Sequence, residues 1–208
     1  MAEFPDTRNV LEPDCRRCPA LVECRERVSW GTGPLDATVM VVGEAPGAGN
    51  PDAERWRGGN WTGKAYTTRH SGRRVRDLVA DAGYAGDAYF TNAVKCFPEG
   101  EDGSNREPTG EERANCRDHL EREIEQVDPA VVLATGRHAT RTMLAFDGDA
   151  LDGFVDGVLD PVECEALGVA VLPLLHPSYQ DVWTARLGYD GEDEYVAAVA
   201  DRIDALLG

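Results

Sequence analysis

Cysteine is the residue type with the most evident chemistry in this 208-residue chain, which contains six of them. Cys15 and Cys18 form a C-x2-C pair, a spacing that directs two thiolates at one metal site. Cys96 and Cys116 can supply two further ligands. Four thiolates suit either a zinc ion or an iron–sulfur cluster, and the prolines close to Cys18 and Cys96 favour the cluster. The competing interpretation is that some of these cysteines are small buried apolar side chains.

A second set of polar residues follows the apolar segments that we expect to form strands. These segments and the residues at their carboxyl ends are 38–42 with Gly43–Gly47, 88–94 with Asn92–Cys96, 130–134 with Thr135 and Gly136, and 169–175 with His176–Ser178. In an open parallel sheet the ligand binds beyond the carboxyl ends of the strands. We therefore expect these polar residues to gather at one edge of the sheet and to form the functional site.

Amphipathic segments separate the apolar ones and predict helices. We expect helices over residues 18–28, 73–82, 109–127, 137–146 and 194–207. Thr109 and Glu112 form the capping box of the third of these helices. Buried strands that alternate with amphipathic helices indicate an α/β fold, in which helices cover both faces of a parallel sheet.

The composition is that of one globular domain. Hydrophobic residues make up 42% of the chain and charged residues 28%, which excludes a disordered or collagen-like protein. The longest apolar segments are too short to span a bilayer, so we expect no membrane association. The first ten residues lack the basic and then apolar pattern of a secretory signal, and we expect a cytoplasmic protein.

The net charge is strongly negative. The chain carries 38 acidic residues against 21 basic ones, a formal charge of −17, and only Lys64 and Lys95 are lysines. A surplus of acidic residues with almost no lysine favours a protein adapted to a salt-rich cytoplasm. An ordinary acidic cytosolic protein would explain the net charge but not the shortage of lysine. A negative surface argues against nucleic acid as a partner, although a charge bias set by the solvent still permits a locally basic cleft.

Several short motifs together resemble a known family. In chain order they are Cys15-x2-Cys18-Pro19, Arg25-x-Arg27-Val28, Gly31-x-Gly33, Val41–Gly47, Thr91–Cys96, Asn105-Arg106-x-Pro108-Thr109, Glu111-Glu112-x3-Cys116, Leu133-Ala134-x-Gly136-Arg137 and His176-Pro177-Ser178. Their order and approximate spacing resemble the family 4 uracil-DNA glycosylases, the iron–sulfur branch of the uracil-DNA glycosylase superfamily. The resemblance covers about residues 15–179.

The resemblance implies a three-layer α/β/α sandwich on a central four-stranded parallel sheet, formed by residues 1–208 as a single domain. It implies a structural 4Fe-4S cluster bound by Cys15, Cys18, Cys96 and Cys116, which would tie the N-terminal segment to that domain. Cys24 and Cys164 match no ligand position. The activity that it implies is hydrolysis of the N-glycosidic bond of uracil in DNA, after the nucleotide is flipped out of the duplex.

The resemblance also implies roles for individual residues. His176 would donate a hydrogen bond to the charge that develops on uracil. Glu44 and Asn105 would activate or orient the attacking water. Asn92 would read the edge of the base, since its amide offers both a donor and an acceptor.

Trp61 would stack on the flipped base. Gly43, Ala45 and Gly47 would let the backbone approach the base, and Ser178 would hold a phosphate. Tyr179 or Val182 would wedge into the DNA. Residues 66–71 depart from the family pattern, so base selectivity is less certain than the chemistry. Further candidates for contacts to the DNA backbone are Arg69, Arg73, Arg74 and Arg76.

The predicted function is therefore a monofunctional glycosylase that acts on uracil-containing DNA, as a monomer. No lysine occupies a position suited to Schiff-base chemistry, with Lys95 as the one candidate. One alternative is a glycosylase for other deaminated bases. Another is a non-catalytic nucleic-acid-binding module with zinc or an iron–sulfur cluster. A sliding clamp is a candidate for a further partner.

Overall fold

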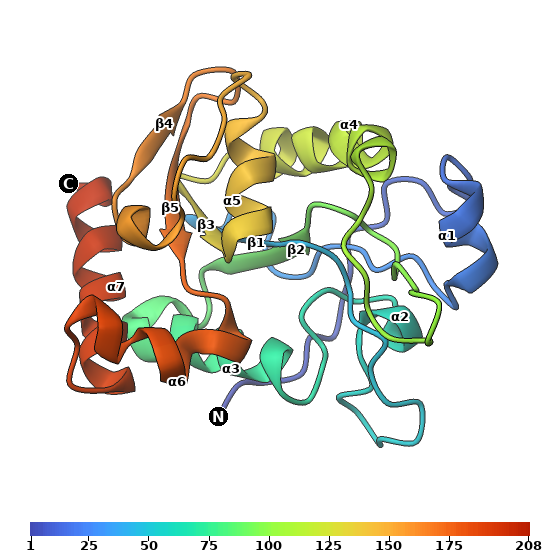
Figure 1. The fold of residues 1–208 in the computed structure, drawn as a ribbon, viewed down its shortest axis with the longest axis horizontal. Coiled ribbons are helices and arrows are strands. Elements are labelled where there is room, and N and C mark those ends of the chain that lie inside the picture. Colours follow the sequence, from blue (N-terminus) through green and yellow to red (C-terminus); the bar gives the residue numbers. More distant parts are fainter.

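A five-stranded sheet with helices on both faces forms the centre of the molecule (Figure 1). The computed structural model describes residues 1–208, with only the backbone described for Asp181. The strands are β1 (Val39–Gly43), β2 (Ala88–Asn92), β3 (Val131–Thr135), β4 (Val162–Cys164) and β5 (Val169–Leu174). The helices are α1 (Pro19–Cys24), α2 (Gly59–Thr62), α3 (Ser71–Val79), α4 (Gly110–Val127), α5 (Arg137–Leu144), α6 (Gln180–Trp183) and α7 (Glu192–Leu207).

The strand order is β2-β1-β3-β5-β4, and the first four of these strands are parallel. The predicted α/β fold is thus confirmed. The sheet has one strand more than the four predicted, because residues 162–164 pair antiparallel with β5 and cover its outer edge. Such a short strand protects the edge of a sheet from pairing with another chain.

Side chains alternate between the two faces of the buried strands, and each face packs against its own layer of helices. In β1, Val39 and Val41 belong to the apolar cluster that includes α3 and α7, whereas Met40 and Val42 belong to the cluster that includes α4 and α5. Successive strand side chains point to opposite faces, so this alternation places one pair of helices on each face. The three-layer α/β/α arrangement follows.

The ends of the predicted helices differ from the observed ones for local reasons. The helix predicted over 18–28 ends at Cys24, after which Arg25 is extended and its side chain reaches Cys96. The helix predicted from residue 73 begins at Ser71 and continues after Val79 as a π-helical turn. The capping box of α4 is confirmed, since Thr109 Oγ1 accepts from the Glu112 amide and Glu112 accepts from the Thr109 amide. Among the described residues, no helix has both the length and the apolar character needed to cross a bilayer.

The register of the sheet brings the polar strand ends together. Gly43 of β1 lies beside Asn92 of β2, and Thr135 of β3 lies beside Leu174 of β5, one residue before Leu175 and His176. These positions share one edge of the sheet, as predicted from the carboxyl ends of parallel strands.

A third apolar cluster lies beyond this edge and contains the N-terminal part of the chain. It joins Cys18 and Leu21 of α1 to Trp30, Val94 and Cys96, and also to Cys116 of α4. Figure 1 shows α1 at the end of the molecule opposite α7. Segments that are far apart in the sequence therefore meet around the predicted metal ligands.

A buried ion pair holds β2 to α4. Lys95 Nζ lies 2.6 Å from Glu123 Oε2, and their side chains are only 1% and 0% exposed. Lys95 also donates to the Asn92 carbonyl at 2.5 Å and to Thr91 Oγ1 at 2.8 Å. Glu123 accepts further hydrogen bonds from Thr91 and Tyr89. The pair is thus fully hydrogen-bonded, which a buried pair needs in order to be tolerated.

We predict that Lys95→Met lowers the free energy of unfolding by ~3–5 kcal/mol, because it leaves the Glu123 carboxylate buried without a cation. Urea titration measures the change. The matched control is Lys64→Met, since Lys64 Nζ donates to the backbone carbonyls of Pro5 and Asp6 and lies over the Phe4 ring. We expect this control to cost about 1 kcal/mol. Equal losses in the two variants would contradict the prediction.

Candidate active site

A cavity of about 370 Å³, here called the rim cavity, lies at the carboxyl edge of the sheet. Eight of the nine residues predicted to bind or act on the substrate line it. These eight are Gly43, Glu44, Ala45, Gly47, Asn92, Asn105, His176 and Ser178. A cavity of about 530 Å³, here called the side cavity, adjoins it and shares Glu44, Thr135 and His176 with it. The sequence prediction of one shared edge therefore corresponds to a real hollow.

Asn92 lies at the floor of the rim cavity. It ends β2 and is buried. A Cβ atom added at Gly43 would come within 2.5 Å of Asn92 Oδ1 and 2.6 Å of the Tyr66 hydroxyl. Only glycine therefore fits at the end of β1, and its absent side chain leaves room for two polar groups to meet there.

Tyr66 is the aromatic residue of the rim cavity. Its hydroxyl forms a 2.6 Å hydrogen bond with Thr135 Oγ1, and its ring packs edge-on against Phe90. Its backbone has a φ of 53°, the left-handed conformation that non-glycine residues rarely adopt. Such strain persists only where the surroundings fix it, and it is frequent at functional sites.

Arg76 holds the backbone of Tyr66 in place. Its Nε donates to the Tyr66 carbonyl at 2.9 Å, and its Nη2 donates to Ala65 and Thr32. The guanidinium also lies over the Phe90 ring at 4.0 Å. Burial lowers the pKa of Arg76 to about 10, so the group remains charged at neutral pH. The prediction that Arg76 contacts DNA is wrong, because the residue is buried.

Trp61 is not one of the described residues that line the rim cavity. Its Nε1 donates to the Ala48 carbonyl at 2.8 Å, and Arg57 lies over its ring. The residue predicted to stack on the base thus fastens the outer loop, while Tyr66 faces the cavity. Trp61 and Tyr66 are five positions apart in one loop, and no local pattern shows which of them turns inward.

His176 follows β5 and presents one ring nitrogen as a donor. Its Nδ1 accepts a hydrogen bond from the Ser178 amide at 3.2 Å. Burial lowers the pKa of His176, and a protonated His138 would lower it further, so the ring is neutral at pH 7. A neutral ring whose Nδ1 accepts carries its proton on Nε2. Gly136 supports this ring, since a Cβ there would lie 3.0 Å from the Cβ of His176.

Glu44 is a partly buried carboxyl group at the boundary of the two cavities. Burial and, to a smaller extent, the Glu107 carboxylate raise its pKa to about 7, while Arg113 and Arg141 act in the opposite direction. Its Oε1 is buried and has no hydrogen-bond partner within the described part of the chain. A carboxyl group that changes charge near neutral pH is suited to general acid–base catalysis.

Asn105 closes the loop after β1. Its Oδ1 accepts from the Ala48 amide at 3.1 Å, and its Nδ2 would lie 3.3 Å from a Cβ atom at Gly47. Ser178 lies on the other side of the opening and is exposed. Next to it, Tyr179 and Val182 are 59% and 57% exposed, which is unusual for large apolar side chains. Two apolar side chains therefore project near the mouth of the cavity.

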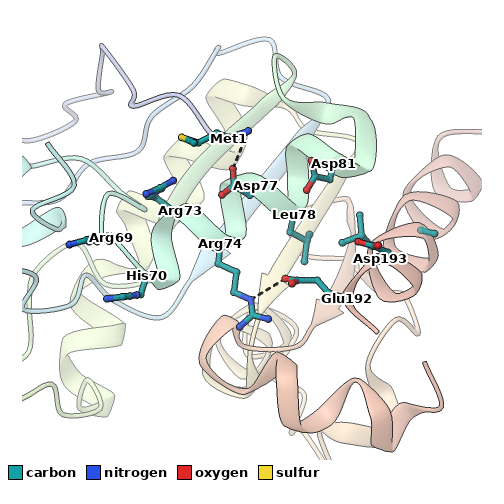
Figure 2. A pocket seen from close by; sticks show the side chains of 12 residues that line it. Met1, Arg69, His70, Arg73, Arg74, Asp77, Leu78, Asp81, Glu192 and Asp193 are labelled. Atoms are coloured by element: carbon teal, nitrogen blue, oxygen red, sulfur yellow. Dashed lines mark hydrogen bonds and ion pairs between the residues drawn. The ribbon is translucent and has the colours of Figure 1, made fainter. Parts of the chain in front are cut away.

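Arginines gather beside this mouth on α3 and the turn before it. Figure 2 shows Arg69, Arg73 and Arg74 around a hollow of about 780 Å³ that also contains Asp77 and Glu192. Arg74 donates to Glu192 and to the Pro177 carbonyl, and thereby fixes the segment that carries Ser178. This hollow is the largest of the three, but it contains none of the predicted catalytic residues.

Four of the six cysteines share one buried site. They are 5–8% exposed, their thiols are free, and they are the predicted ligands Cys15, Cys18, Cys96 and Cys116. Burial raises the pKa of Cys96 to about 12, with smaller contributions from Cys116 and Cys15 in the same direction and from Arg25 in the opposite one. Cys18, Cys96 and Cys116 belong to one apolar cluster, and Arg25 donates to both Cys96 Sγ and the Cys15 carbonyl. Four buried thiols in one region suit a metal centre, because a bound cation compensates the charge of the thiolates.

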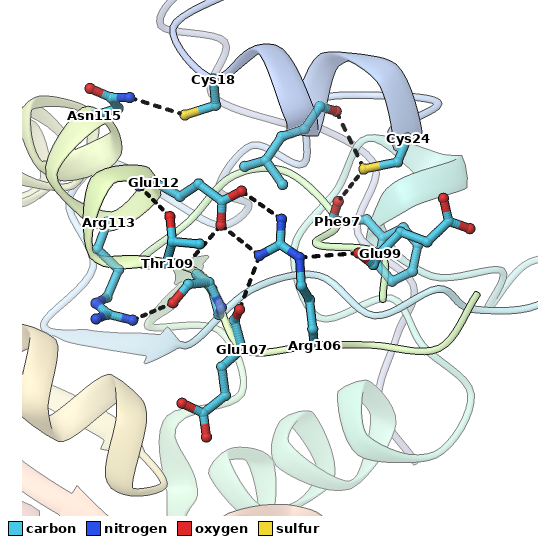
Figure 3. A network of polar contacts seen from close by, with 12 residues as sticks. Cys18, Cys24, Phe97, Glu99, Arg106, Glu107, Thr109, Glu112, Arg113 and Asn115 are labelled. Atoms are coloured by element: carbon cyan, nitrogen blue, oxygen red, sulfur yellow. Dashed lines mark hydrogen bonds and ion pairs between the residues drawn. The ribbon is translucent and has the colours of Figure 1, made fainter. Parts of the chain in front are cut away.

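The other two cysteines lie elsewhere. Cys24 donates to the Phe97 carbonyl at 3.3 Å (Figure 3), and Cys164 packs against α5 in the sheet core. Around the four-cysteine site, Arg25 Nη1 donates to Cys96 Sγ at 2.9 Å and Asn115 Nδ2 donates to Cys18 Sγ at 3.5 Å. Hydrogen bonds of this kind orient and tune the sulfur ligands of a metal centre.

Comparison with known proteins agrees with this geometry. The chain matches the uracil DNA glycosylase superfamily over residues 30–201. It is 34% identical over 203 residues to the type-5 uracil-DNA glycosylase of Pyrobaculum aerophilum, which covers 84% of this chain and 82% of that protein. It is also 34% identical over 167 residues to the type-4 uracil-DNA glycosylase of Thermotoga maritima, which covers 79% and 77% of the two chains. The type-4 enzyme of Archaeoglobus fulgidus is 32% identical over 167 residues, or 79% of this chain and 76% of its own. The chain belongs to the uracil DNA glycosylase superfamily.

Proposed function

We propose that this protein removes uracil from DNA by hydrolysing the N-glycosidic bond of a flipped nucleotide. The observation that carries this proposal is that Asn92, Glu44 and His176, from three different strand ends, line one cavity. Family membership and the names of the relatives, which include both type-4 and type-5 enzymes, support the same activity. The monomeric state, the single domain and a sliding-clamp partner stay predictions of the sequence.

The residue at the floor of the rim cavity, Asn92, can recognise the base. The Asn92 amide can donate to O4 of uracil and accept from its N3–H. Cytosine presents the opposite pattern at these atoms, so a fixed amide disfavours it. Tyr66 takes the stacking role that the sequence assigns to Trp61, because Tyr66 lines the cavity.

Bond cleavage places negative charge on the departing uracil. We assign the stabilisation of that charge to the Nε2–H of His176, a donor whose orientation is set by the Ser178 amide. Glu44, when ionised, is the base for the attacking water, and Asn105 holds the loop around it. Lys95 takes no part, because it is buried in its pair with Glu123.

The DNA backbone would lie along the mouth of the rim cavity. Arg69 and Arg73 line the hollow beside it and can contact phosphates, despite the net charge of −17. The exposed Tyr179 and Val182 are placed to fill the gap that the flipped base leaves in the stack.

We assign a 4Fe-4S cluster to Cys15, Cys18, Cys96 and Cys116. When bound, it would act as a structural crosslink and supply no step of the hydrolysis. Its ligands come from the N-terminal segment, the loop after β2 and helix α4. The four thiolates would therefore join three separate segments next to the rim cavity.

We predict that His176→Ala lowers the single-turnover rate of uracil excision by about 10²–10³-fold, the usual effect of removing such a donor. The substrate is a uracil-containing oligonucleotide at high salt. Glu163→Ala, which changes an exposed residue of β4 that lines neither the two cavities nor the arginine-lined hollow, should retain the wild-type rate. No activity in the wild type or in His176→Ala would favour a non-catalytic binding module, whereas equal activity in these two proteins would overturn the role of His176. A panel of oligonucleotides with other deaminated bases tests the remaining alternative.

We predict that Tyr66→Ala weakens binding of DNA that carries a non-cleavable uracil analogue, through the loss of ~1–3 kcal/mol of stacking. Fluorescence anisotropy measures the dissociation constant, for which this loss is a rise of roughly 10- to 100-fold. Tyr66→Phe should keep most of the affinity. Trp61→Ala is the matched control and should bind like the wild type. A larger loss with Trp61→Ala than with Tyr66→Ala would reverse the assignment.

We predict that the purified protein is brown and contains iron, and that Cys96→Ala removes both the colour and the iron. Absorbance and metal analysis are the measurements. Cys164→Ala changes an equally buried cysteine outside the site and should leave both unchanged. A colourless protein with one zinc ion per chain would replace the cluster with a zinc site.

A further inference from the structure

Three ionisable side chains, Glu44, His138 and Glu107, form a compact cluster beside the rim cavity, with one polar atom of each within 4.8 Å of the other two. Glu44 Oε1 lies 3.7 Å from His138 Nδ1, and His138 Nε2 lies 3.0 Å from Glu107 Oε1. The side chains of Glu44 and His138 are 26% and 25% exposed, whereas that of Glu107 is 60% exposed. Glu107 is therefore the member of this cluster that is most exposed to solvent.

The three groups come from three separate elements. Glu44 follows β1, His138 is the second residue of α5, and Glu107 lies in the loop before α4. Figure 3 shows that the Glu107 carboxylate points away from the neighbouring Arg106–Glu112 ion pair. Glu107 thus lies against His138, while Arg106 is held by Glu112.

The neighbours of His138 determine which ring nitrogen carries the proton. Arg141 Nη2 lies 3.4 Å from Nδ1, and a guanidinium can only donate, so Nδ1 accepts. The proton of the neutral ring is then on Nε2, which lies 3.0 Å from Glu107 Oε1. Burial lowers the pKa of His138, as do Arg141, Arg137 and Arg113, while Glu107 raises it. These opposing charges leave a neutral ring that can take a proton at Nδ1 and release one at Nε2.

The unpartnered oxygen of Glu44 faces the accepting side of this ring. Once Glu44 has taken a proton from water, its O–H can donate to Nδ1 after a small approach of the two groups, and it then replaces the long 3.4 Å contact of Arg141 with this nitrogen. His138 lines the side cavity and not the rim cavity, so it does not contact the base. It acts on the reaction through Glu44 and is a positioning residue.

We propose that His138 is a proton relay that carries the proton of the attacking water from Glu44 to Glu107. The C1′–N1 bond breaks with its electron pair leaving on uracil, and the water oxygen forms the new bond to C1′. The water proton passes to Glu44 and then to His138 Nδ1, while the Nε2 proton passes to Glu107 and from there to solvent. This inference rests on the proposed function.

The test compares His138→Ala with the wild type in single-turnover excision of uracil over a range of pH. The wild-type rate should rise with pH through the pKa of Glu44, about 7, and then level off, because the ionised carboxylate is the base. The groups that face Glu44 and set this value are Glu107, Arg113, Arg141 and His138. His138→Ala should keep the rise but lower the plateau by about 10²-fold, the lower end of what positioned proton transfer contributes.

Added imidazole should restore at least tenfold of the lost rate in His138→Ala and leave the wild type unchanged. In the Glu44→Gln variant, the additional substitution of His138 should lower the rate no further, because no proton reaches the ring without the Glu44 carboxylate. Glu107→Gln should lower the rate in the same direction as His138→Ala. Absence of rescue, additive losses in the double variant, or an activity abolished by a chelator of divalent cations would each overturn the relay.

A measurement without substrate separates this inference from the proposed function. The ¹⁵N shifts of the His138 ring, assigned by comparison with His138→Gln, should show the Nε2–H form at neutral pH. Their titration should change when Glu44→Gln is introduced. If the His138 ring is in the Nδ1–H form, or if Glu44→Gln leaves its titration unchanged, the relay is overturned even when the enzyme is active. A wild-type protein that leaves uracil in DNA would instead defeat the proposed function.

Discussion

Lys95 and Glu123 form an ion pair from which water is excluded, and both parts of the proposed enzyme depend on it. Lys95 donates to the carbonyl of Asn92, the residue that we assign to base recognition, and it precedes the ligand Cys96. Glu123 lies about two turns after Cys116 on α4. The pair therefore fixes the end of β2 against the helix that carries a ligand. Because a buried charge without its partner is costly, the rim cavity and the four-cysteine site are held in one arrangement.

Much of the fold was predictable from the sequence, because it depends on local patterns. The apolar segments, the capping box of Thr109 and the polar residues at the strand ends all correspond to observed elements. Parallel strands must end at a common edge, so eight of the predicted site residues meet without further information. The spacing of Cys15 and Cys18 likewise indicated a shared site for thiols.

The remaining parts depend on how loops fold against the sheet, which no local pattern encodes. Tyr66 rather than Trp61 faces the rim cavity because Arg76, from α3, holds its backbone in a left-handed conformation. The same burial makes Arg76 a structural residue although its neighbours Arg73 and Arg74 line the surface hollow. The sequence predicts Lys95 to be a polar residue of the rim, but its ion-pair partner, Glu123, lies 28 positions later on α4. Long-range partners of this kind are visible only in three dimensions.

The positions of the two lysines have a practical consequence. Lys95 is sealed in the interior, and the Lys64 ammonium is hydrogen-bonded to two backbone carbonyls away from the rim cavity. Formaldehyde and activated esters react readily with exposed amines, but neither lysine offers one at the mouth of this cavity, and the amine in the neighbouring hollow is that of Met1. Trapping the protein on its substrate would call for guanidinium-directed dicarbonyls or a photoreactive base instead.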